Sequence, residues 1–221
     1  MKALERLSPN QDSRGGAAVD MLVLHYTGMQ TAEAALARLC DPAAKVSAHY
    51  TVDEAGTVYA HVPEERRAWH AGVSFWAGVT DVNARSIGIE LVNRGHEFGY
   101  RAFPEAQISS LITLCQGILS RHPIPAGRVL GHSDVAPARK EDPGELFPWE
   151  RLAKEGIGLW PDWIESGLGP LVLTRYGYDP DAPLDTVITA FQRHFRPQNL
   201  DGQWDGECAG LLAWLLSTTG V

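Results

Sequence analysis

Cysteine is scarce in this sequence. The 221 residues include three cysteines, Cys40, Cys115 and Cys208, which are widely separated. An odd number without paired spacing is typical of neither a disulfide framework nor a Cys-x-x-Cys metal site. Cys115 lies in the apolar stripe of a helical pattern, where a thiol packs as a small core residue. We therefore expect three reduced thiols.

Long apolar runs are also lacking. The longest, such as MLVLHY and LLAWLL, are too short to span a bilayer. The N-terminal stretch MKALERLSPNQDSRGG contains neither the apolar segment of a secretory signal nor a lipid-attachment cysteine. These absences predict a protein without a membrane span that resides in the cytoplasm. The periplasm is the alternative if a signal has been removed from the chain.

Runs of basic residues are missing as well. The chain has 19 Lys and Arg against 27 Asp and Glu, a formal net charge of −8. A protein that binds by neutralising phosphates needs a basic stripe or patch. We therefore expect no nucleic-acid partner, and the composition carries no prediction of oligomeric state.

Strands alternate with helices in the first part of the chain. Residues 19–27 and 86–93 are apolar and β-branched, as expected of buried strands. Residues 104–122 begin with proline and place apolar side chains at i, i+3, i+4 and i+7, which predicts a long amphipathic helix. The other predicted elements are a helix at 31–40, a hairpin at 47–62 and a strand at 128–132. The fold class is therefore α/β, with a mixed central β-sheet flanked by helices.

The character of the sequence changes at residues 157–170, which hold three glycines, two prolines and two tryptophans. We place a domain boundary here, between a first domain at 1–160 and a small C-terminal three-helix domain at 161–221. Its helical stretches are PLVLTRYGY, PLDTVITAFQRHF and CAGLLAWLL. A module this short approaches the lower limit for an independent core, so we expect it to pack tightly on its neighbour.

One irregular segment concentrates titratable side chains. GHSDVAPARKEDPG, residues 131–144, has two prolines and two glycines and cannot be mainly helix or strand. His25 and His132 end predicted strands, and Asp142 follows ten residues after His132. Zinc enzymes hold the metal with histidines and carboxylates on rigid elements and leave one position open for water. Spacing alone leaves two interpretations, a metal site or a solvated loop with hydrogen-bonded core histidines.

Five ordered motifs carry a resemblance to a known family. LHYTG, VSAHYTV, RRAWHAG, NARSIGIEL and GHSDVAPARKEDPG resemble the zinc-dependent N-acetylmuramoyl-L-alanine amidases, in the branch of the anhydro-muropeptide amidases. This family is related to peptidoglycan recognition proteins and phage T7 lysozyme. The resemblance covers about residues 19–152. The C-terminal stretch is similar to three-helix peptidoglycan-binding modules, although its last helix departs from the usual pattern.

The resemblance implies a zinc hydrolase with one Zn²⁺ per chain. Its ligands would be His25, His132 and Asp142, which leave a fourth position for water. Glu90 would be the general base that takes a proton from this water and returns it to the leaving amine. Lys140 would face the developing oxyanion. The alternatives are a salt bridge for Glu90 and a solvated surface position for Lys140.

The resemblance further implies seven substrate-binding residues: His49, Tyr50, Trp69, His70, Trp76, Asn83 and Arg85. Trp69 would provide an aromatic face, with a core position as its alternative, and Tyr50 an extra donor to the oxyanion. Lys45 and Asp81 stand where the branch has arginines, so Arg85 would take over the stem-peptide carboxylate. In the loop, Asp134, Arg139 and Glu141 would face outward or brace it.

The sequence is compatible with three functions to different degrees: a peptidoglycan amidase, a recognition protein that binds muropeptide without cutting it, and a metal-dependent nuclease. The acidic charge conflicts with a nuclease. All five metal and catalytic positions are filled, which favours the amidase over the non-catalytic protein. The absent signal favours a soluble 1,6-anhydro-muropeptide substrate, whereas a wall-binding module favours polymeric peptidoglycan. We expect the soluble fragment, in cell-wall turnover and recycling.

Overall fold

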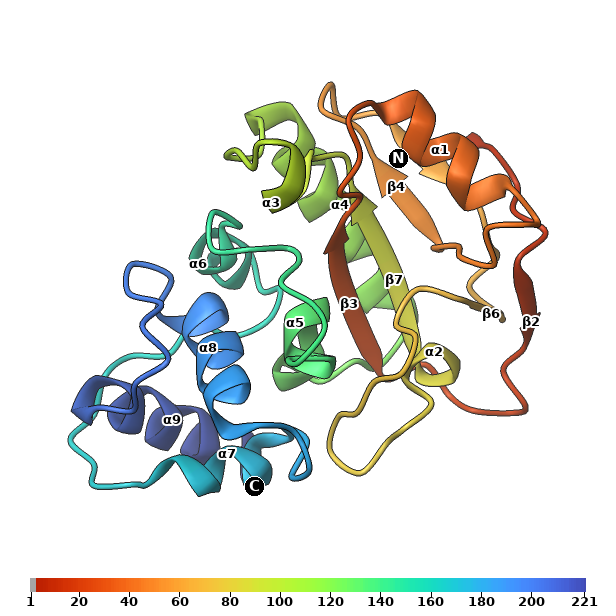
Figure 1. The fold of residues 1–221 in the computed structure, drawn as a ribbon. Helices are drawn as coiled ribbons and strands as arrows, with labels where there is room; N and C mark the ends of the chain where they lie inside the picture. The colour runs from red at the N-terminus through yellow and green to blue at the C-terminus, as the bar shows by residue number, and fades with distance from the viewer. Residues whose placement is uncertain (1–2) are drawn as a thin grey trace.

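The computed structural model describes residues 3–221, which form a mixed α/β fold around a six-stranded sheet (Figure 1). Its strand order is β1 (Leu4–Glu5), β5 (Val58–Ala60), β4 (Tyr50–Val52), β7 (Ser86–Leu91), β3 (Met21–Tyr26) and β8 (Val129–Gly131). The four strands from β4 to β8 in this order are parallel, and β4 and β5 form the predicted antiparallel hairpin. A separate antiparallel pair joins β2 (Gln11–Ser13) to β6 (Arg66–Ala68).

The two central strands bring the ends of distant motifs together. β3 and β7 are parallel, and their register pairs His25 with Glu90 and Tyr26 with Leu91. Both strands are buried over nearly their whole length, which explains their continuous apolar sequences. Ligands of open α/β sheets bind beyond the carboxyl ends of the strands. His25 and Glu90 therefore lie side by side at the edge where a site is expected.

Helices cover the sheet as their sequences predict. α1 (Ala32–Cys40) is capped by Thr31, whose side chain accepts a hydrogen bond from the amide of Ala34 at 3.2 Å. α4 (Glu105–Arg121) packs its apolar stripe against the face that carries Leu22 and Leu24. The short helices are α2 (Val82–Arg85), α3 (Gly95–Phe98), α5 (His132–Val135), α6 (Trp149–Lys154) and the 3-10 turn η1 (Ala126–Arg128). The strand predicted at 128–132 ends at Gly131, because His132 already begins α5.

The C-terminal segment, residues 161–221, contains the turn η2 (Pro170–Val172) and the helices α7 (Leu173–Tyr176), α8 (Leu184–Phe195) and α9 (Gly206–Thr219). These helices gather beside α5, at the lower left of Figure 1. They share one hydrophobic cluster with Met21, Val23 and Leu130 on the second face of the sheet. The domain boundary at residue 160 stays a prediction.

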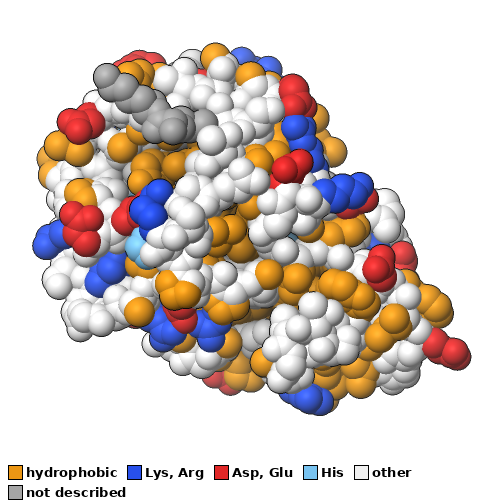
Figure 2. Space-filling view, turned by 180° about the vertical axis from the view of Figure 1, so that it is seen from behind, with side chains coloured by type: hydrophobic (Ala, Val, Ile, Leu, Met, Phe, Trp, Pro, Cys, Tyr) orange, Lys and Arg blue, Asp and Glu red, His pale blue; other side chains and the backbone are white. Residues whose placement is uncertain are grey.

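Other general expectations concern the surface and the thiols. Within residues 3–221, no helix combines the length and apolar character needed to cross a membrane. All three cysteines are unpaired. Seen from behind, acidic and basic side chains lie interspersed around the molecule (Figure 2).

Candidate metal centre and cleft

Three predicted ligands meet beyond the sheet edge. The Nδ1 atom of His25, at the end of β3, lies 2.9 Å from Nδ1 of His132 and 3.0 Å from Oδ2 of Asp142. The third side of this triangle, from His132 Nδ1 to Asp142 Oδ2, measures 3.1 Å. The three side chains are buried. The structure thus brings together a β-strand, the start of α5 and the loop at 131–144 in one candidate metal site.

A chain of hydrogen bonds determines which nitrogen of His25 is free. Its Nε2 lies 3.0 Å from Nδ1 of His70, and Nε2 of His70 lies 3.1 Å from the hydroxyl of Ser86. The Ser86 hydroxyl donates to the carbonyl of Val82 at 2.7 Å, and a carbonyl only accepts. Nε2 of His70 therefore donates to the Ser86 hydroxyl, and Nε2 of His25 donates to Nδ1 of His70. In the neutral ring of His25, Nδ1 then carries no proton. Burial, with His132 beside it, lowers the pKa of His25 to about 4, so the ring is neutral at pH 7.

His132 and Asp142 also present unprotonated ligand atoms to the candidate site. Nε2 of His132 donates to the carbonyl of Ala71 at 3.0 Å, so its Nδ1 also presents a lone pair. Burial alone would raise the pKa of Asp142, but His132 and His25 lower it far below its ordinary value, and the carboxylate is ionised.

Three lone pairs that converge without a proton repel one another unless a cation lies between them. Metal–ligand bonds of about 2.0–2.1 Å in a tetrahedral site separate the ligand atoms by roughly 3.3 Å, close to the triangle formed by His25, His132 and Asp142. The donor set therefore fits a metal ion.

Glu90 lies next to this triangle on β7. Its Oε2 is buried and, in the described part of the chain, has no hydrogen-bond partner and no ion pair. Burial, together with the Asp142 carboxylate, raises the pKa of Glu90 well above its ordinary value, whereas Lys140 acts in the opposite sense. Among the described residues Glu90 forms no salt bridge, which argues against the structural alternative. The carboxylate is free to accept a proton.

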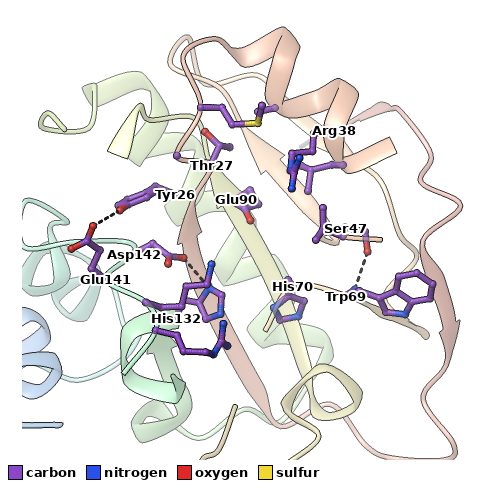
Figure 3. Close-up of a pocket in the computed structure, with 17 residues that line it drawn as sticks. Tyr26, Thr27, Arg38, Ser47, Trp69, His70, Glu90, His132, Glu141 and Asp142 are labelled. Atoms are coloured by element: carbon purple, nitrogen blue, oxygen red, sulfur yellow. Dashed lines mark hydrogen bonds and ion pairs between the residues drawn. The ribbon is translucent and has the colours of Figure 1, made fainter. Parts of the chain in front are cut away.

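A cleft of about 400 Å³ opens over these groups. Besides Glu90, His132, Asp142 and Lys140, Trp69 and His70 line it, as expected, with Trp69 at one end of the view in Figure 3. The amide of Trp69 donates to the hydroxyl of Ser47 at 2.9 Å, and its indole Nε1 is buried without a partner in residues 3–221. Lining residues that the sequence analysis missed include Tyr26, Arg38, Ser47 and Arg139. Tyr26 had a signal, because it directly follows His25 in the LHYTG motif.

Trp76 does not line the cleft, which corrects the prediction. Its side chain is 1% exposed and makes edge-to-face contacts with Tyr176 and Tyr178, at centroid distances of 5.7 and 5.0 Å. The loop that follows RRAWHAG turns this ring toward the C-terminal segment. Trp76 is therefore a core residue between the two parts of the chain.

Asn83 also lies outside the cleft, where its side chain holds the backbone of two residues next to the candidate metal site. Its side-chain oxygen accepts hydrogen bonds from the amides of His70 at 3.0 Å and Ala71 at 2.8 Å. The two residues that it holds are the orienting partners of His25 and His132. Asn83 thus positions the site and does not bind substrate directly.

His49 is behind the cleft and not in it. It is fully buried, its Nδ1 accepts from the amide of Gly88 at 3.0 Å, and its Nε2 lies 2.8 Å from a guanidinium nitrogen of Arg14. Burial and this arginine lower the pKa of His49 to about 3. Its ring therefore cannot reach a substrate over the metal site.

Tyr50 and Arg85 are likewise engaged elsewhere. The hydroxyl of Tyr50 donates to Glu64 at 2.7 Å, on the β4 side facing away from the cleft lining. Arg85 directly precedes β7, at the amino end of the strand, and pairs with Asp20. The cleft lies at the carboxyl end, so Arg85 cannot take the place of the missing arginines.

The loop residues around the candidate ligands have two roles: two of them brace the loop and one is exposed. Arg139 braces the loop, because its guanidinium donates to the carbonyl of Ala71 at 3.0 Å. Glu141 is exposed, and its carboxylate lies 3.5 Å from the hydroxyl of Tyr26. Asp134 is 1% exposed, so it braces the loop from within and does not face outward.

Comparison with known proteins places these features in a family. Residues 15–145 match the sequence model of the N-acetylmuramoyl-L-alanine amidase family. The chain is 40% identical to the N-acetylmuramoyl-L-alanine amidase AmiD of Escherichia coli K12 over a 234-residue alignment that covers 91% of this chain and 84% of the relative. It is also 41% identical to the 1,6-anhydro-N-acetylmuramyl-L-alanine amidase AmpD of Enterobacter cloacae, over 48% of this chain and 55% of that protein.

Solved structures agree over nearly the whole length. The complex of Escherichia coli AmiD with the substrate anhydro-N-acetylmuramic acid-L-Ala-D-γ-Glu-L-Lys superposes with a TM-score of 0.83 at 38% identity, covering 93% of this chain and 92% of AmiD. AmpDh3 of Pseudomonas aeruginosa in complex with anhydromuramic pentapeptide gives a TM-score of 0.82 at 36% identity, covering 91% and 92%. The similarity therefore includes the C-terminal segment.

Proposed function

This chain belongs to the N-acetylmuramoyl-L-alanine amidase family, and we propose that its substrate is an anhydro-muropeptide released in cell-wall turnover and recycling. The bond cut joins the lactyl group of 1,6-anhydro-N-acetylmuramic acid to the L-alanine of the stem peptide. One observation carries this proposal: three converging lone pairs of His25, His132 and Asp142 lie beside the unpartnered carboxylate of Glu90.

We infer that the metal is zinc, one ion per chain. Two imidazole nitrogens and one carboxylate oxygen are a ligand set that zinc takes in catalytic sites, with a fourth position left open. Nε2 of each histidine is held by His70 or by the carbonyl of Ala71, as is usual for rings that ligate a metal. When bound, zinc supplies a Lewis acid that polarises the amide carbonyl and lowers the pKa of a water toward about 7.

The residues of the chain divide the proton and charge transfers between them. The Glu90 carboxylate, whose pKa burial raises, takes a proton from the attacking water and returns it to the nitrogen of the departing L-alanine. The ammonium of Lys140, which also lines the cleft, offsets the negative charge of the tetrahedral intermediate. His70 keeps the ring of His25 oriented throughout. No covalent intermediate with the protein is required.

The cleft suits a sugar with a peptide attached. Trp69 offers an apolar ring, and Arg38, Arg139 and Lys140 provide cations for the carboxylates of a stem peptide. The two solved relatives with bound anhydromuramic ligands support a soluble fragment as substrate. A non-catalytic recognition protein is the alternative. Burying the Glu90 side chain without a partner is unfavourable, and muropeptide binding without cleavage would not require it.

The direct test compares substrates. Purified protein with about one zinc per chain is expected to release L-alanine-terminated peptide from anhydro-muropeptide, more slowly from intact sacculi, and to lose activity with a chelator until Zn²⁺ is restored. Binding of muropeptide without cleavage by the zinc-loaded protein would support the recognition alternative. Cleavage of sacculi at an equal rate would remove the preference for the soluble fragment. Residence in the cytoplasm stays a proposal, which cell fractionation checks.

The ligand assignment has its own test within one loop. Asp142→Ala is expected to abolish zinc binding, because it removes a buried charged ligand. Glu141→Ala, one residue away, is the matched control and should leave zinc content and turnover nearly intact, since Glu141 is exposed. Metal analysis of the two variants decides, and equal zinc loss in both would show that the ligands in this loop are assigned wrongly.

A further inference from the structure

We propose that the C-terminal segment holds the metal site in shape, through two side chains that clamp the buried carboxylate of Asp134. Tyr178 and His194 come from the C-terminal segment, whereas Asp134 lies in α5, two residues after the ligand His132. Asp134 is then a positioning residue for the metal centre. This inference rests on the metal site of the proposed function.

Asp134 maintains the turn that carries His132. Its Oδ2 accepts a hydrogen bond from the amide of Gly131 at 2.7 Å, which closes the first turn of α5. Ser133, which lies between the ligand His132 and Asp134, donates its amide to the carbonyl of Asp142 at 2.9 Å. Both ligands of this loop are therefore connected to the same short turn, and a change in its geometry alters the distance between His132 and Asp142.

The carboxylate of Asp134 depends on the C-terminal segment for its remaining donors. The hydroxyl of Tyr178 donates to Oδ1 at 2.8 Å, and Nδ1 of His194 lies 2.7 Å from Oδ2. Tyr178, His194 and Asp134 are at most 3% exposed. A buried carboxylate without donors is strongly unfavourable. Loss of these two donors would leave it with the Gly131 amide alone among the hydrogen bonds within residues 3–221.

His194 is held so that its Nδ1 is the donor. Its ring stacks between Trp149 and Phe195, at centroid distances of 3.7 and 3.9 Å. Its Nε2 is buried and has no partner among the described residues, so a proton there would be left unpaired. The neutral tautomer with the proton on Nδ1 satisfies Asp134. Partners in the outer shell of a metal ligand typically change metal affinity by about 10- to 100-fold.

The test measures zinc affinity of the full-length chain by competition with a chromogenic chelator, at a temperature where every variant is folded. Tyr178→Phe and His194→Phe keep the rings and remove the donors. Each is expected to weaken zinc binding about tenfold, and the double variant about 100-fold. The visible spectrum of the Co²⁺-loaded double variant should also differ from that of wild type, because the ligand geometry changes.

Three further variants separate positioning from general destabilisation. His194→Asn places an amide N–H where Nδ1 was, and should restore affinity to within about threefold of wild type. Tyr176→Phe removes a hydroxyl that makes no hydrogen bond among the described residues and should bind zinc normally. Gln192→Met removes buried hydrogen bonds to Gly202 and Gln203 in the same segment without contacting Asp134, so it should lower thermal stability and leave zinc affinity unchanged.

The outcomes are distinct. Zinc binding by the double variant as tight as in wild type would overturn the inference, as would an equal loss of affinity in Gln192→Met. If the wild-type chain bound no zinc at all, the proposed function would fail first, and this result is seen before any variant is compared.

Discussion

Each histidine of the metal centre has one ring nitrogen committed to a protein acceptor. Nε2 of His25 donates a hydrogen bond to Nδ1 of His70, and Nε2 of His132 donates one to the carbonyl of Ala71. A neutral imidazole carries one proton, so the second nitrogen of each ring faces the centre as a lone pair. The His70 ring and the Ala71 carbonyl, both outside the triangle, therefore leave the candidate site suited to a metal ion.

At the same scale, Glu90→Gln separates proton transfer from metal binding. The amide keeps the shape but cannot accept a proton, so kcat should fall roughly 100- to 10,000-fold while zinc content stays unchanged. Glu141→Gln is the control for removal of a nearby carboxylate that the cleft exposes to solvent. Turnover and metal analysis on the same preparations check this. Near-normal turnover of Glu90→Gln would assign Glu90 a structural role.

Strand β7 is the element on which the site is built. One face of this strand carries Ser86, Gly88 and Glu90. The Ser86 hydroxyl accepts a hydrogen bond from His70, and Glu90 lies beside the candidate metal ligands. Gly88, between them, leaves room for the ring of His70, because a Cβ there would overlap the ring. The absence of a side chain at Gly88 thus allows the imidazole of His70 to lie against the strand.

Gly88→Ala is therefore expected to displace His70 and weaken the orientation of His25. Overpacking of this kind costs about 1–3 kcal/mol of the free energy of unfolding, and zinc affinity should fall with it. Gly117→Ala in α4 is the matched control, because its Cβ would meet only the flexible end of Arg121. A helical Gly→Ala change is stabilising by about 0.5–1 kcal/mol. Equal, small effects of both changes in denaturation and zinc titration would contradict this account.

A second element-scale feature joins β4 to α4. Burial alone would raise the pKa of Glu64, but hydrogen bonds from Arg121, His122 and Tyr50 outweigh it and lower the pKa to about 2. A carboxylate whose pKa is lower in the folded state stabilises the fold above its unfolded pKa, 4.5. This contribution is lost as the pH falls from 4.5 toward about 2.

Glu64→Gln should accordingly be less stable than wild type near pH 6, and this difference should shrink as the pH falls from about 4.5 to about 2. Urea denaturation at a series of pH values measures it. Glu65→Gln, at the exposed neighbour with no ion pair in residues 3–221, is expected to follow the wild-type curve. A constant difference between Glu64→Gln and wild type across this range would show that the carboxylate charge is not responsible.

At the scale of the whole molecule, the two parts of the chain share a core. One cluster lies between the sheet and α4, and the other joins the opposite face of the sheet to the C-terminal helices. The amide of Ala77 donates to the carbonyl of Gly177 at 2.8 Å beside Trp76, which fills the junction. The C-terminal segment thus completes the hydrophobic core of the catalytic part.

Trp76→Ala should for this reason destabilise both parts together. Removing a fully buried tryptophan typically costs about 3–5 kcal/mol. Trp163→Ala is the control, since that side chain is 57% exposed and should cost far less. Denaturation followed by two probes, one in each part, is expected to show a single transition in Trp76→Ala, shifted by the same amount for both probes. Two separated transitions would show that the parts unfold independently. An unchanged midpoint would contradict a shared core at this residue.

Local sequence determined the secondary-structure elements, and the family motifs indicated the candidate metal ligands. The strands at 19–27 and 86–93 and the helices at 31–40 and 104–122 follow from apolar periodicity and capping, which act between near neighbours. His25 and His132 end predicted strands and Asp142 lies in a proline-rich loop, but this spacing alone left a metal site and a solvated loop as alternatives. The resemblance to the amidases implied the three as ligands, and the structure brings their side chains together.

Only the tertiary structure decided which other side chains reach the cleft. His49, Tyr50, Asn83 and Arg85 belong to the same motifs as the site residues, and Trp76 follows one of these motifs. None of these five side chains lines the cleft, because each is engaged by another part of the chain. Asp134 became part of the site through Tyr178 and His194, more than forty residues away. The position of each of these side chains depends on the buried group that it hydrogen-bonds or packs against. Those partners come from distant segments and are brought together only by the tertiary fold.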